Sequence, residues 1–199
     1  MRIQTCTRVK RIKITPPNPL LGSLISTGEM VAFKEIQRTK QDECYIKQEI
    51  TNHSLIQHKS IIPLLGVLEN VKLNTETLIM EYAEEGDLLQ YKRKQKQGFS
   101  ETEIKDIFKE TAEAIEELWR NNMIHRDIKP ANLLIFKTKE PNNHYQEEEE
   151  GEEPEQGEGE LKLHVKLCDF GNSFVLSPSV CPKTYIGNER YLSPEVVNL

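Results

Sequence analysis

Long apolar segments are missing from this 199-residue sequence, and their absence sets the first limit on what the chain is. No apolar run approaches the about 20 residues that a helix needs to cross a bilayer, so we expect no membrane span. Basic residues near the N-terminus are not followed by the apolar region of a secretory signal. A mitochondrial presequence is the alternative, but the alternation of Val9, Ile12 and Ile14 with charged residues favours an edge strand.

Cysteine is also scarce, with four residues, and no two of them form a CxxC pair. Neither a zinc site nor a disulfide framework is therefore predicted. Without a secretory signal or a disulfide pattern, the sequence indicates an intracellular protein with reduced thiols, in the cytoplasm or the nucleus. The content of 37% hydrophobic and 29% charged residues is typical of a globular chain with a core.

Basic residues are absent from residues 147–160, which contain nine glutamates. Without these nine glutamates the net charge would change from −6 to +3, so the acidity of the chain is local. Like charges repel, and the segment offers little to bury, which predicts a disordered acidic insert at residues 138–160. The alternative is a docking site for a basic partner. No nucleic-acid partner is expected.

Hydrophobic periodicity predicts a definite order of secondary structure. The expected elements are a helix at residues 42–57 and strands at residues 30–34, 77–82, 132–136 and 161–167. Ser100 and Glu103 form a capping box that starts a longer helix, whose apolar residues repeat at helical spacing. The first half is thus rich in strands, and the second half opens with a long helix. This order predicts an α+β chain in two lobes.

Polar residues suited to phosphoryl transfer gather in residues 125–132, with the sequence HRDIKPAN. The reaction needs a carboxylate that orients the attacking hydroxyl, a cation near the migrating phosphate and oxygen ligands for magnesium. Asp127, Lys129 and Asn132 supply these groups on a loop between the long helix and a strand. Asp169 follows the last predicted strand and precedes a phenylalanine and a glycine, which makes it a further candidate magnesium ligand.

These two stretches match, in order, the H-R-D-x-K-P-x-N and D-F-G motifs of protein kinases. From residue 27 to residue 199 the chain resembles the catalytic core of a eukaryotic serine/threonine protein kinase, and Lys129 is typical of that type. The resemblance implies a protein-kinase-like two-lobe fold. Its N-lobe sheet and αC helix would occupy residues 1–83, and an incomplete helical C-lobe would occupy residues 84–199 and end after a Ser-Pro-Glu motif.

The resemblance also implies the reaction and its residues, namely transfer of the γ-phosphoryl group of Mg-ATP to serine or threonine of a protein substrate. Asp127 would orient the hydroxyl and Lys129 would steady the γ-phosphate. Asn132 and Asp169 would hold magnesium.

The nucleotide site follows from the same resemblance. Lys34 would bind the α- and β-phosphates, with Glu49 as its ion-pair partner. The other residues expected around the nucleotide are Ala32 and Leu134 against the adenine, Met80 as gatekeeper, Glu81 and Ala83 with backbone groups for the adenine, and Asp87 near the ribose.

Several positions depart from the family pattern. The glycine-rich phosphate loop has no counterpart, since residues 1–33 contain only Gly22 and Gly28. The sequence stops four residues after Glu195, so we expect a domain cut short at both ends. Asn188 and His53 stand where the family usually has a threonine and an aliphatic residue. The alternative function is therefore an inactive kinase-like binding module or a partial gene product.

A regulatory site is expected at Thr184, eleven residues before Glu195. In kinases that carry an arginine before the catalytic aspartate, a phosphate on this segment pairs with that arginine, which is Arg126 here. Tyr185 and Ser177 are the alternative modified residues.

Overall fold

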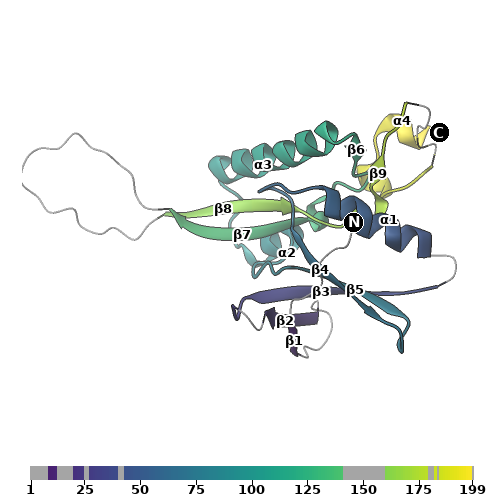
Figure 1. Ribbon diagram of the computed structural model, residues 1–199. Helices are drawn as coiled ribbons and strands as arrows, with labels where there is room; N and C mark the ends of the chain where they lie inside the picture. The colour runs from purple at the N-terminus through teal and green to yellow at the C-terminus, as the bar shows by residue number, and fades with distance from the viewer. Residues whose placement is uncertain are drawn as a thin grey trace, which may run out of the picture.

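The computed structural model describes residues 9–12, 20–24, 27–39, 43–140, 160–178, 182 and 184–198. An antiparallel sheet lies at one end of the molecule, and the long helix α3 (Glu101–Arg120) lies at the other end (Figure 1). The two-lobe α+β fold expected from the sequence is confirmed.

Five strands form the N-lobe sheet in the order β1-β2-β3-β5-β4, and all neighbours are antiparallel. The strands are β1 (Val9–Ile12), β2 (Leu20–Leu24), β3 (Met30–Gln37), β4 (Leu64–Asn70) and β5 (Thr75–Glu81). The expected edge strand is β1. Alternate residues of β3 point inward, and Val31 and Phe33 form a small core with Ile79 of β5.

Helix α1 (Glu43–Leu55) forms where the sequence predicts a helix. Its buried face consists of Ile46, Glu49, Asn52 and His53. Because three of these four side chains are polar, the face needs hydrogen-bond partners in the rest of the molecule. The partners are Lys34 for Glu49, Ser173 for Asn52 and the Ile62 carbonyl for His53. Helix α1 also packs against the 3₁₀ turn Phe170–Asn172.

The C-lobe starts with two capped helices. Asp87 caps α2 (Leu88–Lys94) by accepting a hydrogen bond from the backbone N–H of Gln90. The capping box predicted at Ser100 and Glu103 is present at the start of α3. Strands β7 (Leu133–Glu140) and β8 (Glu160–Leu167) form an antiparallel hairpin that packs on α3.

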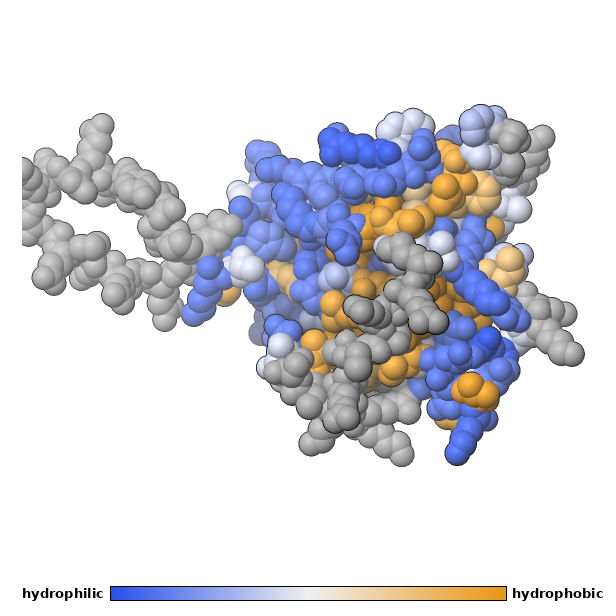
Figure 2. Space-filling model, viewed as in Figure 1, coloured by the Kyte–Doolittle hydropathy of each residue, from blue (hydrophilic) through white to orange (hydrophobic). Residues whose placement is uncertain are grey.

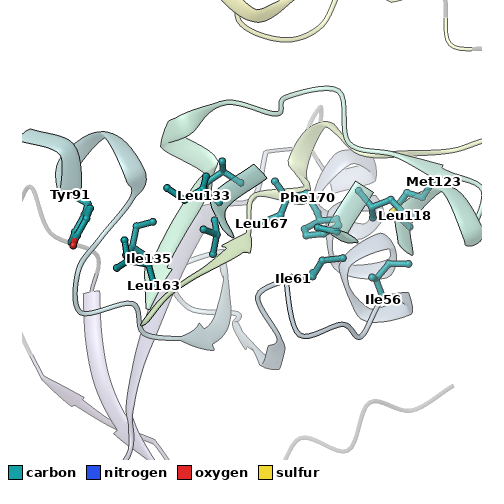
Figure 3. Packing of buried hydrophobic residues seen from close by; sticks show 13 residues of the cluster. Ile56, Ile61, Tyr91, Leu118, Met123, Leu133, Ile135, Leu163, Leu167 and Phe170 are labelled. Atoms are coloured by element: carbon teal, nitrogen blue, oxygen red, sulfur yellow. The ribbon is translucent and has the colours of Figure 1, made fainter. Parts of the chain in front are cut away.

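The main core joins the two lobes (Figure 3). Ile56 and Ile61 follow helix α1 and meet Leu118 of α3 and Phe170 in one cluster of buried side chains. Each such side chain contributes about 1.5–3 kcal/mol when fully buried. On the face shown in Figure 2, the surface over α3 and the nearby hairpin is largely hydrophilic, while apolar side chains gather toward the centre.

The predicted bounds of the acidic insert, 138–160, are wrong at both ends, because β7 continues to Glu140 and β8 starts at Glu160. Thr138, Lys139 and Glu140, expected in a disordered segment, continue β7, and Glu140 pairs with Glu160 of β8. The pairing extends because Thr138 lies beside Lys162 and His164 in the hairpin and bonds to the His164 ring. The remaining residues, 141–159, lie outside the described residues.

Short elements frame the two motifs. Strand β6 (Met123–Ile124) leads into residues 125–132 and pairs with β9 (Phe174–Val175), which follows Asp169. The 3₁₀ turn Pro130–Asn132 ends the first motif, and α4 (Pro194–Val197) lies near the end of the chain. Among the described residues, no helix is long and apolar enough to span a bilayer.

Candidate active site

A cleft of about 600 Å³ lies between the two lobes. Its walls come from β3, α1, the end of β5 and the segment that follows it, α2, the start of β7 and the two residues after β8. All nine residues predicted to bind the nucleotide line this cleft: Ala32, Lys34, Glu49, Met80, Glu81, Ala83, Asp87, Leu134 and Asp169. Asn132 lines it as well.

Lys34 joins the lobes through two ion pairs. Its Nζ lies 2.7 Å from Glu49 Oε1 on α1 and 2.7 Å from Asp169 Oδ1. Burial alone would lower the pKa of Lys34, but the two carboxylates outweigh it and raise that pKa. Burial would likewise raise the pKa of Asp169, but Lys34 outweighs it and lowers that pKa. The lysine and Asp169 are therefore both charged near neutral pH.

The backbone after β8 is shaped to bring Asp169 to Lys34. Asp169 has a φ of +69°, a left-handed conformation that costs a non-glycine residue about 1 kcal/mol or more. A Cβ at Gly171 would lie 3.3 Å from Glu49 Oε2 and 3.4 Å from Asp169 Oδ1. The glycine thus allows Glu49 and Asp169 to approach the same lysine.

The catalytic loop residues hold one another in place. Oδ2 of Asp127 accepts hydrogen bonds from Lys129 Nζ at 2.6 Å and from Asn132 Nδ2 at 3.0 Å. Asn132 Nδ2 also donates to the backbone carbonyl of Asp127 at 2.8 Å. Within the described part of the chain, no donor reaches Oδ1 of Asp127, so this oxygen is available to an incoming hydroxyl.

His125 ties the catalytic loop to the end of β8. Its Nδ1 accepts from the backbone N–H of Asp127 at 3.3 Å, and its Nε2 lies 3.1 Å from the carbonyl oxygen of Cys168. Burial lowers the pKa of His125, which keeps the ring neutral, and raises the pKa of the Cys168 thiol to about 12. The backbone N–H of Cys168 also donates to the Asn132 carbonyl at 2.9 Å.

Asn132 and Asp169 fit a magnesium ion. The amide nitrogen of Asn132 is occupied by Asp127, so its side-chain oxygen is the atom left for a cation. No group of three or more His, Cys, Asp or Glu side chains suited to a metal occurs among the described residues. The amide oxygen of Asn132 and the carboxylate of Asp169 together suit magnesium, which takes one or two protein oxygens together with phosphate oxygens and water.

The end of β5 makes a contact that the sequence did not predict. Glu81 forms a 2.5 Å ion pair with Lys166 of β8, and the Lys166 ammonium also lies 4.6 Å from the centre of the Phe136 ring. The Glu81 side chain is therefore held by the C-lobe, and only its backbone is free to face a nucleotide. No local pattern in the sequence indicates this pair.

Thr184 and Arg126, expected to pair once Thr184 is phosphorylated, already lie in contact through the unmodified hydroxyl. An Arg126 terminal nitrogen donates to Thr184 Oγ1 at 3.0 Å, and its Nε donates to the Asn172 carbonyl at 2.6 Å. Arg126, Thr184 and Asp127 line a second cavity of about 480 Å³. Asn188 bonds to the backbone N–H of Arg190, which caps a short turn.

His53 has a polar role at a position where an aliphatic residue was expected. The ring is 2% exposed and stacks on Phe170, with centroids 4.6 Å apart and planes 12° apart. Its Nε2 lies 2.7 Å from the carbonyl oxygen of Ile62. This contact requires an N–H at Nε2, and burial lowers the pKa of His53, so the neutral ring is the donor.

We expect the protein to lose stability as the pH falls below 6.5, the ordinary histidine pKa. Burial holds the pKa of His53 and of His125 below that value, so the unfolded chain binds more protons than the folded chain in acid. The stability that the two neutral histidines contribute is fully present above pH 6.5 and is lost as the pH falls through their lowered pKa values. Urea unfolding between about pH 7.5 and about pH 5.5 measures it.

His53→Leu should make this dependence on pH shallower. Lys34, Asp169 and His125 act on the charge of His53, so the same titration should be repeated in Lys34→Met. His58→Gln, outside the core, is the matched control. An unchanged pH dependence in His53→Leu would contradict the assignment.

Comparison with known proteins agrees with this geometry. A family model described as "Protein kinase domain" matches residues 21–199. Human NUAK family SNF1-like kinase 2 is 30% identical over 177 residues, which cover 87% of this chain and 24% of that protein. The SNF-related serine/threonine-protein kinase of Rattus norvegicus is 31% identical over 183 residues, covering 89% of this chain and 21% of that protein.

A solved structure has the same fold. A chain of the yeast RNA Pol II CTD kinase CTDK-1 complex superposes with a TM-score of 0.64 at 20% identity, over 89% of this chain and 51% of that chain. The chain therefore belongs to the protein kinase domain family, as the two motifs predicted. It spans about a fifth to a quarter of the length of the curated relatives that it matches.

Proposed function

We propose that this chain carries the phosphoryl-transfer site of a serine/threonine protein kinase, which moves the γ-phosphoryl group of Mg-ATP to serine or threonine of a protein. The proposal rests on one observation above all. The Lys34–Glu49 and Lys34–Asp169 ion pairs are formed at the cleft, close to a catalytic loop in which Lys129 and Asn132 hold Asp127. The names of relatives described as serine/threonine kinases support the choice of substrate hydroxyl.

Each of these side chains has a separate role in the proposed reaction. Oδ1 of Asp127 orients the substrate hydroxyl and accepts its proton, while Lys129 balances charge on the transferred phosphoryl group. Lys34, fixed by Glu49, binds the α- and β-phosphates. Asn132 and Asp169 would hold magnesium, which supplies positive charge to the phosphate oxygens when it is bound.

An inactive nucleotide-binding module is the second candidate. It is supported by the scarcity of glycine before Lys34. Residues 1–33 contain only two glycines, so few backbone N–H groups there can approach the phosphates without hindrance from a Cβ atom. Such a module would bind Mg-ATP weakly and would transfer no phosphate. Incubation with labelled ATP and mixed serine and threonine peptides separates the two candidates.

Nucleotide binding should depend on magnesium. At an ATP concentration of 100 times the Kd, binding adds about 2.7 kcal/mol of stability, which raises Tm by roughly 5–10 °C in a chain of this size. With EDTA, or in Asp169→Asn, most of this shift should disappear. Asp106→Asn on α3 is the matched control, and differential scanning fluorimetry is the measurement.

Two results would overturn parts of the proposal. A shift of equal size with and without magnesium would contradict the role of Asn132 and Asp169 as metal ligands. No shift with any adenine nucleotide would contradict the nucleotide site itself.

A further inference from the structure

The buried face of α1 carries a polar side chain that the proposed reaction does not use. Glu49 is paired with Lys34, and His53 is bonded to Ile62. Asn52, between them, is 4% exposed, and its side chain donates its hydrogen bonds to Ser173, a residue with no assigned role toward the nucleotide or the hydroxyl. A buried amide that loses its hydrogen bonds destabilises a protein by about 1–3 kcal/mol, so its partners define its role.

The partner of Asn52 is Ser173, 121 residues later in the chain. Asn52 Nδ2 donates to the Ser173 carbonyl at 3.1 Å and lies 2.9 Å from Ser173 Oγ. Ser173 is 2% exposed, and its Oγ donates in turn to the Phe170 carbonyl at 2.6 Å. Gln48 Nε2 also donates from α1 to the Ser173 carbonyl, and at 3.5 Å this bond is the longest of the three.

This network fixes the backbone directly after Asp169. Phe170 starts the 3₁₀ turn, and the backbone N–H of Ser173 closes it on the Phe170 carbonyl at 3.0 Å. Asp169 itself keeps a left-handed φ of +69°, a conformation that persists only where the surrounding structure enforces it. Asn52 supplies part of that enforcement by fastening the far end of the turn to a helix.

The same helix presents Glu49 one turn before Asn52. Residues three apart lie on one face of a helix, so a movement of α1 that breaks the Asn52–Ser173 bond also displaces Glu49. Lys34 is held by Glu49 and Asp169 together. The helix position and the Asp169 backbone are thereby linked through two separate contacts, one ionic and one between neutral groups.

We propose that Asn52 is a positioning residue, which holds the Asp169-Phe170-Gly171 segment in its magnesium-binding conformation through Ser173. The inference rests on the proposed function, because it takes Asp169 as a magnesium ligand. It differs from that function in naming a neutral hydrogen bond between α1 and Ser173 as the contact on which the ligand geometry depends.

Asn52→Leu tests the proposal in the 199-residue chain. It removes the amide with little change in size and is expected to weaken Mg-ADP binding by about tenfold, the loss of roughly one to two hydrogen bonds. Binding of ADP in EDTA should change by less than about twofold. Ser173→Ala should have a similar but smaller effect, and the double variant should be little worse than Asn52→Leu alone. Thr51→Leu, exposed on the same helix, is the matched control.

Hydrogen exchange provides a second measurement that does not require magnesium binding. In Asn52→Leu, exchange should accelerate in residues 170–175 and stay unchanged in α3. Equal weakening of ADP binding with and without magnesium, or unaltered exchange in residues 170–175, would overturn the proposal. If the parent chain bound no nucleotide, the proposed function would fail, and the exchange result would still decide whether Asn52 holds the segment.

Discussion

Asp127→Asn is expected to lower kcat for peptide phosphorylation by about 10²–10⁴-fold, the usual contribution of a positioned general base. The Kd for Mg-ATP should change by less than about threefold, because the lost carboxylate acts on the hydroxyl rather than on the nucleotide. The variant keeps the size of the side chain and the oxygen that accepts from Lys129 and Asn132. Steady-state kinetics with a serine peptide measure kcat, and an independent nucleotide titration measures the Kd for Mg-ATP.

Because Asp127 contacts Asn132, a control must separate the loss of the base from a disturbed magnesium ligand. Asn132→Ala should raise the magnesium concentration needed for half-maximal activity, whereas Asp127→Asn should leave it almost unchanged. Asp106→Asn should behave as the parent chain. Turnover of Asp127→Asn within about twofold of the parent would remove Asp127 from the proposed role.

Phosphorylation of Thr184 is expected to raise activity by tenfold or more, an increase of about 1.4 kcal/mol in transition-state stabilisation. Thr184 Oγ1 already lies 3.0 Å from an Arg126 nitrogen. A phosphate adds about −1.5 to −2 charge and three acceptor oxygens at this point, and a guanidinium binds it in a bidentate manner. Arg126 also bonds to Asn172, so the added contact orders the segment that follows Asp169.

The matched variants are Thr184→Ala, Arg126→Lys and the double variant. Arg126→Lys retains the charge but loses the two-pronged geometry. Each single change should remove most of the gain, and the double variant should be little worse than either. Tyr185→Phe and Ser177→Ala should leave the gain intact. Independent, additive losses, or phosphate found only on Tyr185 or Ser177 by mass spectrometry, would contradict the pairing.

The catalytic loop could be predicted from the sequence because its residues are close together in the chain. Asp127, Lys129 and Asn132 are on one loop, and short-range spacing fixes their contacts. The position of Asp169 at the end of β8 also follows from a local pattern, a strand that alternates and then stops. The family resemblance supplied the partners of Lys34, which no local pattern contains.

The contacts that escaped prediction join residues far apart in sequence. Asn52 and Ser173 are 121 residues apart, and Glu81 and Lys166 are 85 apart. In each pair, the sequence around one residue does not indicate which distant polar side chain will lie opposite it. His53 was recognised only as a departure from an aliphatic pattern, and its bond to Ile62 depends on how α1 meets the start of β4. Strand β7 was predicted too short because its last four residues, 137–140, are polar and their pairing depends on β8.

The pairing of Glu140 with Glu160 gives the chain a natural point for engineering. These two residues lie at neighbouring positions at one end of the β7–β8 hairpin (Figure 1). We expect a change of length between these two residues to alter mainly the loop-closure entropy, whose cost rises by about 0.6 kcal/mol for each doubling. A fluorescent protein or an affinity tag inserted there would report on the kinase domain while leaving the register of β7 and β8 as it is.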